Sequence, residues 1–457
     1  MNRITKRTWI MGLFLLLLLG GLLFFVWEYV TQAESWVSFS GSPHLYNSSN
    51  IGCGIITDRS GNVLLDISQG RTYSDNANTR KSTLHWLGDK KGFISASTVS
   101  TYAADMVGYD QVNGVYNASG EGGNARLTLS AKVQNAALEA MGNRKGTVGV
   151  YNYKTGEILC ALTTPTYDPE NVPDIAGDTT GAYDGVYLNR FLQSAYVPGS
   201  IFKIVTLSAA LDCVPGIEDM TFTCRSKLAY GTEAVTCEKA HGTQTLKQAF
   251  ANSCNCAFAQ IAELVGKNNM VKYVRQFQVT QKLSFDGSTT AAGNYDISDT
   301  APVSFAWSCI GQHSDLVNPA RYMTFMGAIA GRGVAAEPYL MDTVTNGGDT
   351  TYEAKTKKTD RIMPESIADT VAEYMRNNVK TVYGDSNFGG LPVCAKSGTS
   401  QLGGDQKSNA MFAGFVDSEQ YPLAFIVVVE NGGYGSHTCV PVISKVLAAC
   451  KSVMDAE

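Results

Sequence analysis

The feature that most constrains this chain is an uninterrupted run of apolar residues and glycines from Trp9 to Trp27. A helix over this run is long enough to cross the roughly 30 Å hydrocarbon core of a bilayer. Tryptophans bracket the run, cations precede it, and Glu28 and Glu34 follow it. Because cations favour the cytoplasmic side, the sequence predicts a cytoplasmic tail over 1–8, a transmembrane helix over 9–27 and an extracytoplasmic remainder.

A cleaved signal peptide is the alternative interpretation of this run, with Thr31-Gln32-Ala33 as the cleavage site. The apolar core is longer than the roughly 7–15 residues usual in signal peptides. We therefore favour a single-pass anchor, which makes the cell membrane one expected partner of the chain.

Charge and histidine spacing argue against two classes of function. Lys plus Arg number 36 against 41 Asp plus Glu, and the net charge is -5. The chain thus lacks the positive excess typical of nucleic-acid binding, and no nucleic-acid partner is expected. The five histidines form no short-range ligand pair, so the sequence predicts neither a metal site nor a cofactor.

The cysteines of an exported chain indicate disulfide bonds, although the count of 11 is odd and leaves at least one thiol unpaired. We predict one bridge between Cys224 and Cys237, because both lie in a polar, turn-rich segment. The alternative is that both thiols are unpaired.

Two regions follow the apolar run. Residues 28–123 are rich in Ser, Asn, Gly and Tyr, which favours a small, turn-rich module. Residues 124–457 begin with a helix-like segment capped by Ser130, and helical stretches dominate from Ser200 to about Gly333. Strand-like runs lie on both sides of that stretch, at Thr147–Tyr153, Ile158–Leu162, Leu391–Ala395, Met411–Val416 and Leu423–Glu430. This order predicts an α+β domain whose first and last segments share one antiparallel sheet.

A serine and a lysine at helical spacing are the first candidates for chemistry. A serine hydroxyl is a poor nucleophile until a base takes its proton, and a lysine one turn away can be that base if its pKa is lowered. Ser200-Ile201-Phe202-Lys203 has this spacing and follows Pro198-Gly199, so Ser200 is expected at a helix start. The helix dipole and apolar surroundings both disfavour the charged form of Lys203.

Two further motifs follow in the order that this chemistry requires. Ser253-Cys254-Asn255 lies between two helix-like segments, where Ser253 can relay a proton and Asn255 can hold the substrate or Lys203. Lys396-Ser397-Gly398-Thr399 follows a strand-like run. Its lysine and hydroxyl groups can bind a substrate carboxylate, and its glycine permits close backbone approach.

Each motif alone is a weak signal, and Lys154-Thr155-Gly156 matches the third motif inside a predicted hairpin. The ordered set S-x-x-K, S-x-N, K-[ST]-G is the strong signal, since it is the signature of serine enzymes that recognise β-lactams. On these motifs the chain resembles class B penicillin-binding proteins from about residue 124 to the end. Other stretches that carry the resemblance are Leu188-Asn189-Arg190, Ala240-His241-Gly242 and Pro165-Thr166-Tyr167-Asp168-Pro169.

The resemblance implies a transpeptidase fold with a five-stranded antiparallel sheet flanked by helices. It implies that the D-Ala-D-Ala end of a peptidoglycan stem peptide acylates Ser200, and that this acyl group is then transferred to an amine of a neighbouring strand. It also implies that penicillin acylates the same serine. By the same resemblance the backbone N–H groups of Ser200 and Thr399 form the oxyanion hole. The implied catalytic residues are Ser200, Lys203, Ser253, Asn255 and Lys396, and the implied substrate-binding residues are Ser397, Gly398 and Thr399. A separate membrane glycan polymerase is expected as partner, because no glycosyltransferase domain fits in the remaining residues.

Three alternatives stay open on sequence alone. A D,D-carboxypeptidase uses the same motifs and transfers the acyl group to water. A β-lactamase must also hydrolyse its acyl-enzyme quickly, and the sequence identifies no deacylating glutamate. A non-catalytic β-lactam receptor keeps the fold, but a sensor should carry a cytoplasmic signalling domain or several membrane spans.

Overall fold

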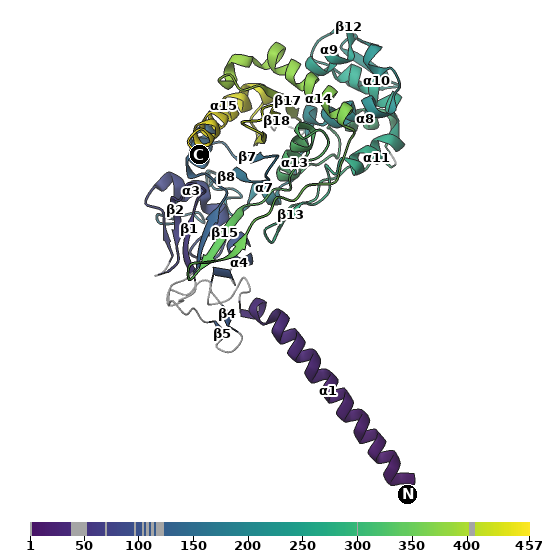
Figure 1. The fold of residues 1–457 in the computed structure, drawn as a ribbon. Helices are drawn as coiled ribbons and strands as arrows, with labels where there is room; N and C mark the ends of the chain where they lie inside the picture. The colour runs from purple at the N-terminus through teal and green to yellow at the C-terminus, as the bar shows by residue number, and fades with distance from the viewer. Residues whose placement is uncertain are drawn as a thin grey trace.

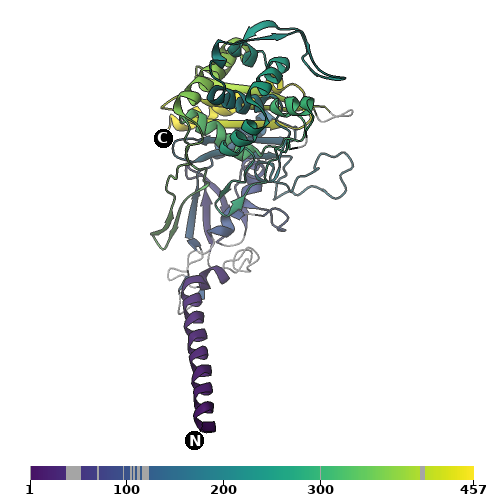
Figure 2. The ribbon, with the colours of Figure 1, turned by 90° about the vertical axis from the view of Figure 1, so that its right-hand side faces the viewer.

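The computed structural model describes residues 2–37, 53–68, 71–95, 97–102, 105–106, 109–110, 114–115, 123–298, 300–401 and 407–457. Helix α1 (Asn2–Val37) extends away from the rest of the molecule (Figure 1). Figure 2 shows the same arrangement after a 90° turn about the vertical axis. Its large apolar side chains are exposed, Trp9 at 78%. In the described part of the chain, Arg3–Ala33 is the one helix long and apolar enough to cross a membrane, by length and composition alone. The predicted apolar helix is confirmed, and it is longer than 9–27.

A five-stranded antiparallel sheet forms the centre of the larger region, in the order β17-β18-β19-β7-β8. Its strands are β7 (Gly146–Asn152), β8 (Ile158–Thr164), β17 (Val393–Ser400), β18 (Asn409–Val416) and β19 (Leu423–Val429). Every residue of β7, β8, β18 and β19 is buried, so helices must cover both faces. The prediction that strands from both ends share one antiparallel sheet is confirmed.

Helices on the two faces of this sheet enclose two apolar cores. On one side lie α6 (Ala131–Met141), which Ser130 caps as predicted, and α15 (Gly435–Met454). On the other side α13 (Pro319–Ala330) contacts β7, β18 and β19. Helix α7 (Arg190–Gln193) contacts β7 and β8, and α14 (Glu365–Asn378) contacts β17. The other helices of this region are α8 (Lys203–Cys213), α9 (Leu246–Ala251), α10 (Asn255–Val265), α11 (Lys267–Gln276) and α12 (Pro302–Cys309).

Short strands lie between the helices of the stretch from Ser200 to about Gly333, in which the sequence predicted that helices dominate. Strand β9 (Thr221–Cys224) pairs with β12 (Gly242–Thr245), and β10 (Lys227–Tyr230) pairs with β11 (Glu233–Thr236). A third small pair is β13 (Ser284–Phe285) with β14 (Ser288–Thr289). Short 3₁₀ and π turns also occur, at Gly199–Phe202, Ile217–Asp219, Val379–Tyr383 and Asp385–Phe388. The first two strand pairs lie near α9 and α10, which brings them close to the second motif.

A second sheet lies between α1 and the helical part of the molecule (Figure 1). Its order is β16-β15-β6-β1-β2-β3, and it is mixed because β1 and β6 run parallel. The strands are β1 (Cys53–Thr57), β2 (Val63–Asp66), β3 (Thr72–Tyr73), β6 (Gly123–Leu127), β15 (Met341–Asn346) and β16 (Asp349–Glu353). Helices α3 (Ala77–Leu87) and α4 (Ser97–Thr101) and the strand pair β4 (Tyr109–Asp110) and β5 (Gly114–Val115) complete this region. The boundary at 123/124 stays a prediction, and two strands of this sheet come from well beyond it.

Candidate active site

Ser200 lies in a tight 3₁₀ turn over Gly199–Phe202 that leads directly into α8. Gly199 has φ +56°, and a Cβ there would meet the backbone oxygen of Thr399 at 2.6 Å. A residue with a side chain would thus be strained and would clash with β17. The expected position of Ser200 at a helix start is confirmed, and the turn packs directly against the strand that carries the third motif.

Lys203 lies one turn after Ser200 and is fully buried, with 0% exposure. Its Nζ is 2.9 Å from Ser200 Oγ, and it donates hydrogen bonds to Ser253 O at 2.8 Å and Asn255 Oδ1 at 2.7 Å. Those two oxygens can only accept hydrogen bonds. In a neutral amine they engage both N–H groups, so the lone pair is free to accept the proton of Ser200.

Burial lowers the pKa of Lys203 to about 7. Burial likewise lowers the pKa of Lys396, whose exposure is 0%, and the nearby Lys203 lowers it further. Each lysine is therefore less favourable as a cation than in water, and two charges in one dry site repel. At neutral pH a substantial fraction of Lys203 is the free base.

Ser253 joins the two lysines. Its Oγ lies 3.2 Å from Lys203 Nζ and 3.0 Å from Lys396 Nζ, in the loop between α9 and α10 that the sequence predicted. The backbone of Ser253 has φ +51°. A residue other than glycine held there costs about 1–3 kcal/mol, so surrounding contacts must enforce this conformation.

The third motif forms the end of β17, whose alternation sorts its side chains onto two faces. Lys396 and Gly398 are buried, whereas Ser397 and Thr399 are partly exposed. Lys396 Nζ donates to Ser397 O at 3.0 Å as well as to Ser253 Oγ. A Cβ on Gly398 would meet Pro198 O at 2.7 Å, so the glycine allows β17 to lie close to the 3₁₀ turn that carries Ser200.

Two residues at this site were not predicted from the sequence. Tyr383 OH accepts a hydrogen bond from Ser397 N at 2.9 Å and lies 3.1 Å from Ser397 Oγ. Gln312 Nε2 donates to Thr399 O at 3.1 Å. No short motif marks Tyr383, which ends the π turn after α14; such turns are frequent at functional sites. Both residues hold the backbone or hydroxyls of the third motif.

The predicted Cys224–Cys237 disulfide is wrong, because both thiols are free. The two sulfurs lie within 4.8 Å of one another without a bond, and the residues come from the ends of β9 and β11, which belong to separate two-stranded sheets. Cys224 Sγ instead lies 3.4 Å from His241 Nδ1, and Cys237 Sγ lies 3.7 Å from Cys254 Sγ. The distance between the Cys237 and Cys254 sulfurs far exceeds an S–S bond of about 2.05 Å.

The family described as "Penicillin binding protein transpeptidase domain" has a sequence model that matches residues 146–448. The chain belongs to this family. The predicted resemblance to class B penicillin-binding proteins is thereby confirmed, and the match includes all three motifs of this penicillin-binding protein.

Curated relatives of this penicillin-binding protein include the peptidoglycan D,D-transpeptidase PbpA of Mycolicibacterium smegmatis, which is 28% identical over 344 residues, 68% of each chain. Stage V sporulation protein D of Bacillus subtilis is 26% identical over 402 residues, which are 82% of this chain and 58% of the relative.

Solved structures show the same fold. The D,D-transpeptidase domain of a peptidoglycan glycosyltransferase from Eggerthella lenta has a TM-score of 0.75 at 25% identity, covering 89% of this chain and 99% of the other. Penicillin-binding protein A of Mycobacterium tuberculosis, in its ceftriaxone acyl-enzyme complex, also has a TM-score of 0.75, at 21% identity and the same coverage. The predicted transpeptidase fold is confirmed.

Proposed function

We propose that this penicillin-binding protein is a serine D,D-transpeptidase that cross-links peptidoglycan stem peptides, with Ser200 as its nucleophile. The observation that carries the proposal is the hydrogen-bonded connection from Ser200 Oγ through Lys203 and Ser253 to Lys396. It unites three motifs from distant parts of the chain around one hydroxyl. The relatives named peptidoglycan D,D-transpeptidase support the same reaction.

Acylation begins when neutral Lys203 takes the proton of Ser200, whose Oγ attacks the carbonyl carbon of the penultimate D-Ala. The bond to the terminal D-Ala breaks, and the leaving nitrogen receives a proton through Lys203 and Ser253. An amine of a second stem peptide then attacks the ester and loses a proton to the same base. Ser200 regains its hydrogen as the new peptide bond forms, so the enzyme ends unchanged.

The substrate carboxylate lies, in this proposal, beside the partly exposed hydroxyls of Ser397 and Thr399. Lys396 donates hydrogen bonds to Ser253 Oγ and to the backbone oxygen of Ser397, on the buried side of β17. Backbone N–H groups of Ser200 and Thr399 stabilise the negative oxygen of the tetrahedral intermediate, where each such donor is worth about 2.7–4 kcal/mol. Penicillin acylates the same serine, a view supported by the acyl-enzyme complexes of structural relatives.

A direct test supplies the purified full chain with uncross-linked peptidoglycan carrying pentapeptide stems. We expect dimeric stem peptides, because the acyl group is transferred to an amine, and none with the Ser200→Ala variant. Mass spectrometry of the digested product distinguishes the outcomes. Tetrapeptide stems and free D-Ala without dimers would show that water is the acceptor, and would replace this proposal with a D,D-carboxypeptidase.

We also propose that α1 anchors the chain in the cell membrane, with residues 1–8 in the cytoplasm and the remainder from Glu28 outside. The exposed apolar surface of α1 and the cations before it support this orientation. Protease added to intact protoplasts should therefore digest the chain from Glu28 onward, as immunoblotting would detect, while a cytoplasmic marker protein stays intact. Full protection of the C-terminal region would reverse the orientation.

A separate membrane glycan polymerase is the proposed partner. Cross-linking needs freshly polymerised strands as substrate, and the family match accounts only for the transpeptidase. The exposed side chains of α1 offer a surface for such a partner within the membrane.

A further inference from the structure

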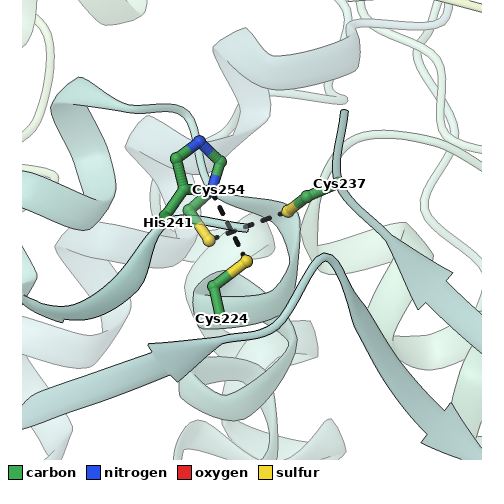
Figure 3. A group of neighbouring side chains, drawn as sticks. All are labelled: Cys224, Cys237, His241 and Cys254. Atoms are coloured by element: carbon green, nitrogen blue, oxygen red, sulfur yellow. Dashed lines mark hydrogen bonds between the residues drawn. The ribbon is translucent and has the colours of Figure 1, made fainter. Parts of the chain in front are cut away.

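Four side chains meet beside the second motif: Cys224, Cys237, His241 and Cys254 (Figure 3). Their three sulfur atoms and one ring nitrogen all lie within 4.8 Å of one another. Each residue comes from the end of a different element. Cys224 ends β9, Cys237 follows β11, His241 precedes β12 and Cys254 caps α10. Convergence of four element ends on one point is unusual for unconnected side chains.

The spacing within this cluster matches ligands around one small ion. Tetrahedral zinc, with Zn–S of about 2.3 Å and Zn–N of about 2.0–2.1 Å, separates its ligand atoms by about 3.8 Å for two sulfurs and about 3.6 Å for sulfur and nitrogen. Cys237 and Cys254 have their sulfurs 3.7 Å apart, and Cys224 Sγ is 3.4 Å from His241 Nδ1. Since all four atoms lie within 4.8 Å of one another, a contraction of at most about 1 Å brings any pair to the same geometry.

We propose that these four residues form a structural zinc site of the Cys₃His type. Thiolate and imidazole ligands select zinc, and a closed set of four protein ligands is typical of structural sites. This site goes beyond the proposed transpeptidase function. No metal was predicted from the sequence because only His-His pairs such as H-E-x-x-H and the pattern C-x-x-C were considered, whereas the short-range pair here is Cys237 with His241, and Cys224 and Cys254 join it from more distant positions.

Backbone N–H groups around the cluster favour thiolates. Cys256 N donates to Cys237 Sγ at 3.3 Å, and Ala257 N donates to Cys254 Sγ at 3.4 Å. Donors of this kind orient metal ligands and stabilise their negative charge. Cys224 and Cys254 are 1% and 0% exposed, so water would not compete for them.

The site is placed to position catalytic groups. Cys254 is the middle residue of the second motif, between Ser253 and Asn255. Asn255 Nδ2 donates at 2.9 Å to the backbone oxygen of Thr236, the residue before Cys237, while its Oδ1 accepts from Lys203. A zinc ion bound to Cys237 and Cys254 would thus fix both sides of this contact. It would also supply the constraint that the strained backbone of Ser253 needs.

A disulfide between Cys237 and Cys254 is the competing structure. It would require the sulfurs to move from 3.7 Å to about 2.05 Å and would leave Cys224 and His241 facing each other without a ligand. Zinc uses all four side chains with smaller movements, and it protects the thiols from oxidation on the extracytoplasmic side of the membrane.

Metal analysis of the full chain, purified in detergent without chelators, tests the site independently of any activity. We expect about one zinc per chain, and intense visible absorption of tetrahedral cobalt thiolate after cobalt replaces zinc. Cys224→Ser and His241→Ala should lose zinc, whereas His241→Cys should retain it because four cysteines also hold structural zinc. Cys213→Ser and His437→Asn are matched controls outside the cluster and should keep the metal.

Removal of zinc by a chelator tests the positioning role. We expect acylation of Ser200 by fluorescent penicillin to slow on the order of 10–100-fold, with recovery when zinc is added back. Acylation at the original rate after stripping would overturn the positioning role. Two results would overturn the site itself: absence of zinc binding by the reduced chain when zinc is supplied, or a Cys237–Cys254 disulfide in the native chain. Neither result would bear on the identity of the nucleophile.

Discussion

Replacing Ser200 by alanine should abolish covalent labelling of the chain by penicillin. In the proposed mechanism the ester forms on Ser200 Oγ, which lies 2.9 Å from Lys203 Nζ, the candidate base, in the turn preceding α8. Ser200 is partly exposed, so loss of one hydroxyl should leave the fold intact. In-gel fluorescence after treatment with a fluorescent penicillin measures the effect. Ser208→Ala, which removes a hydroxyl bonded to Ile204 O on the same helix, is the matched control and should label normally.

Peptide mapping completes this test, because Ser253 Oγ also contacts Lys203. The labelled peptide should contain residue 200, and Ser253→Ala should still be labelled there, at a reduced rate. Wild-type labelling of Ser200→Ala, or a modified peptide that lacks residue 200, would contradict the proposed mechanism.

Replacing Lys203 by methionine should slow acylation by about 10²–10⁴-fold, the range typical for loss of a general base. Methionine keeps the length and apolar stem of this fully buried side chain, which limits the structural cost. The affinity for the drug before acylation should change little. Lys203 is fully buried and contacts Ser200, Ser253 and Asn255, so it does not itself contact the drug in the proposed complex. Stopped-flow acylation at several drug concentrations separates the rate from the affinity.

Lys396→Met is the informative comparison. Lys396 donates hydrogen bonds to Ser253 Oγ and Ser397 O, which orient the proton relay and the strand beside the substrate carboxylate, so both the affinity and the acylation rate should fall. A buried acceptor that loses its donor costs about 1–3 kcal/mol. Lys154→Met is the control, since that lysine belongs to Lys154-Thr155-Gly156, the other match to the third motif, and pairs with Glu419 at the surface. An unchanged acylation rate in Lys203→Met would show that another group is the base.

The sheet and its flanking helices could be predicted because their signals are local. Apolar runs at Val148 and Phe425 lie in strands that are buried on both faces, and Ser130 caps a helix by a bond to its own neighbour. The short strand pairs between α8 and α9 were missed because their alternation spans only four residues each. Such segments take their form from tertiary contacts more than from intrinsic preference.

The residues of the candidate site could be predicted where they belong to short sequence motifs. Spacing placed Ser200 near Lys203, and motif order singled out Lys396 over Lys154. Spacing could not show that Lys396 contacts Ser253, since that bond spans 143 positions and depends on how β17 lies against the helices. Tyr383 and the four-residue cysteine and histidine cluster were not predicted for the same reason, because folding brings together partners that are mostly distant in the sequence.

The six-stranded sheet has a consequence for the order of assembly. Its central strand β6 lies between β1 and β15, and the Arg126–Asp342 ion pair that joins β6 to β15 spans 216 positions. The region next to α1 therefore cannot be completed until the chain as far as β16 has been synthesised, although most of it emerges early. Pairings between distant segments form slowly and leave strand edges unpaired in the meantime. An N-terminal fragment ending before β15 would carry an open edge on β6, so this region matures with the catalytic domain and not before it.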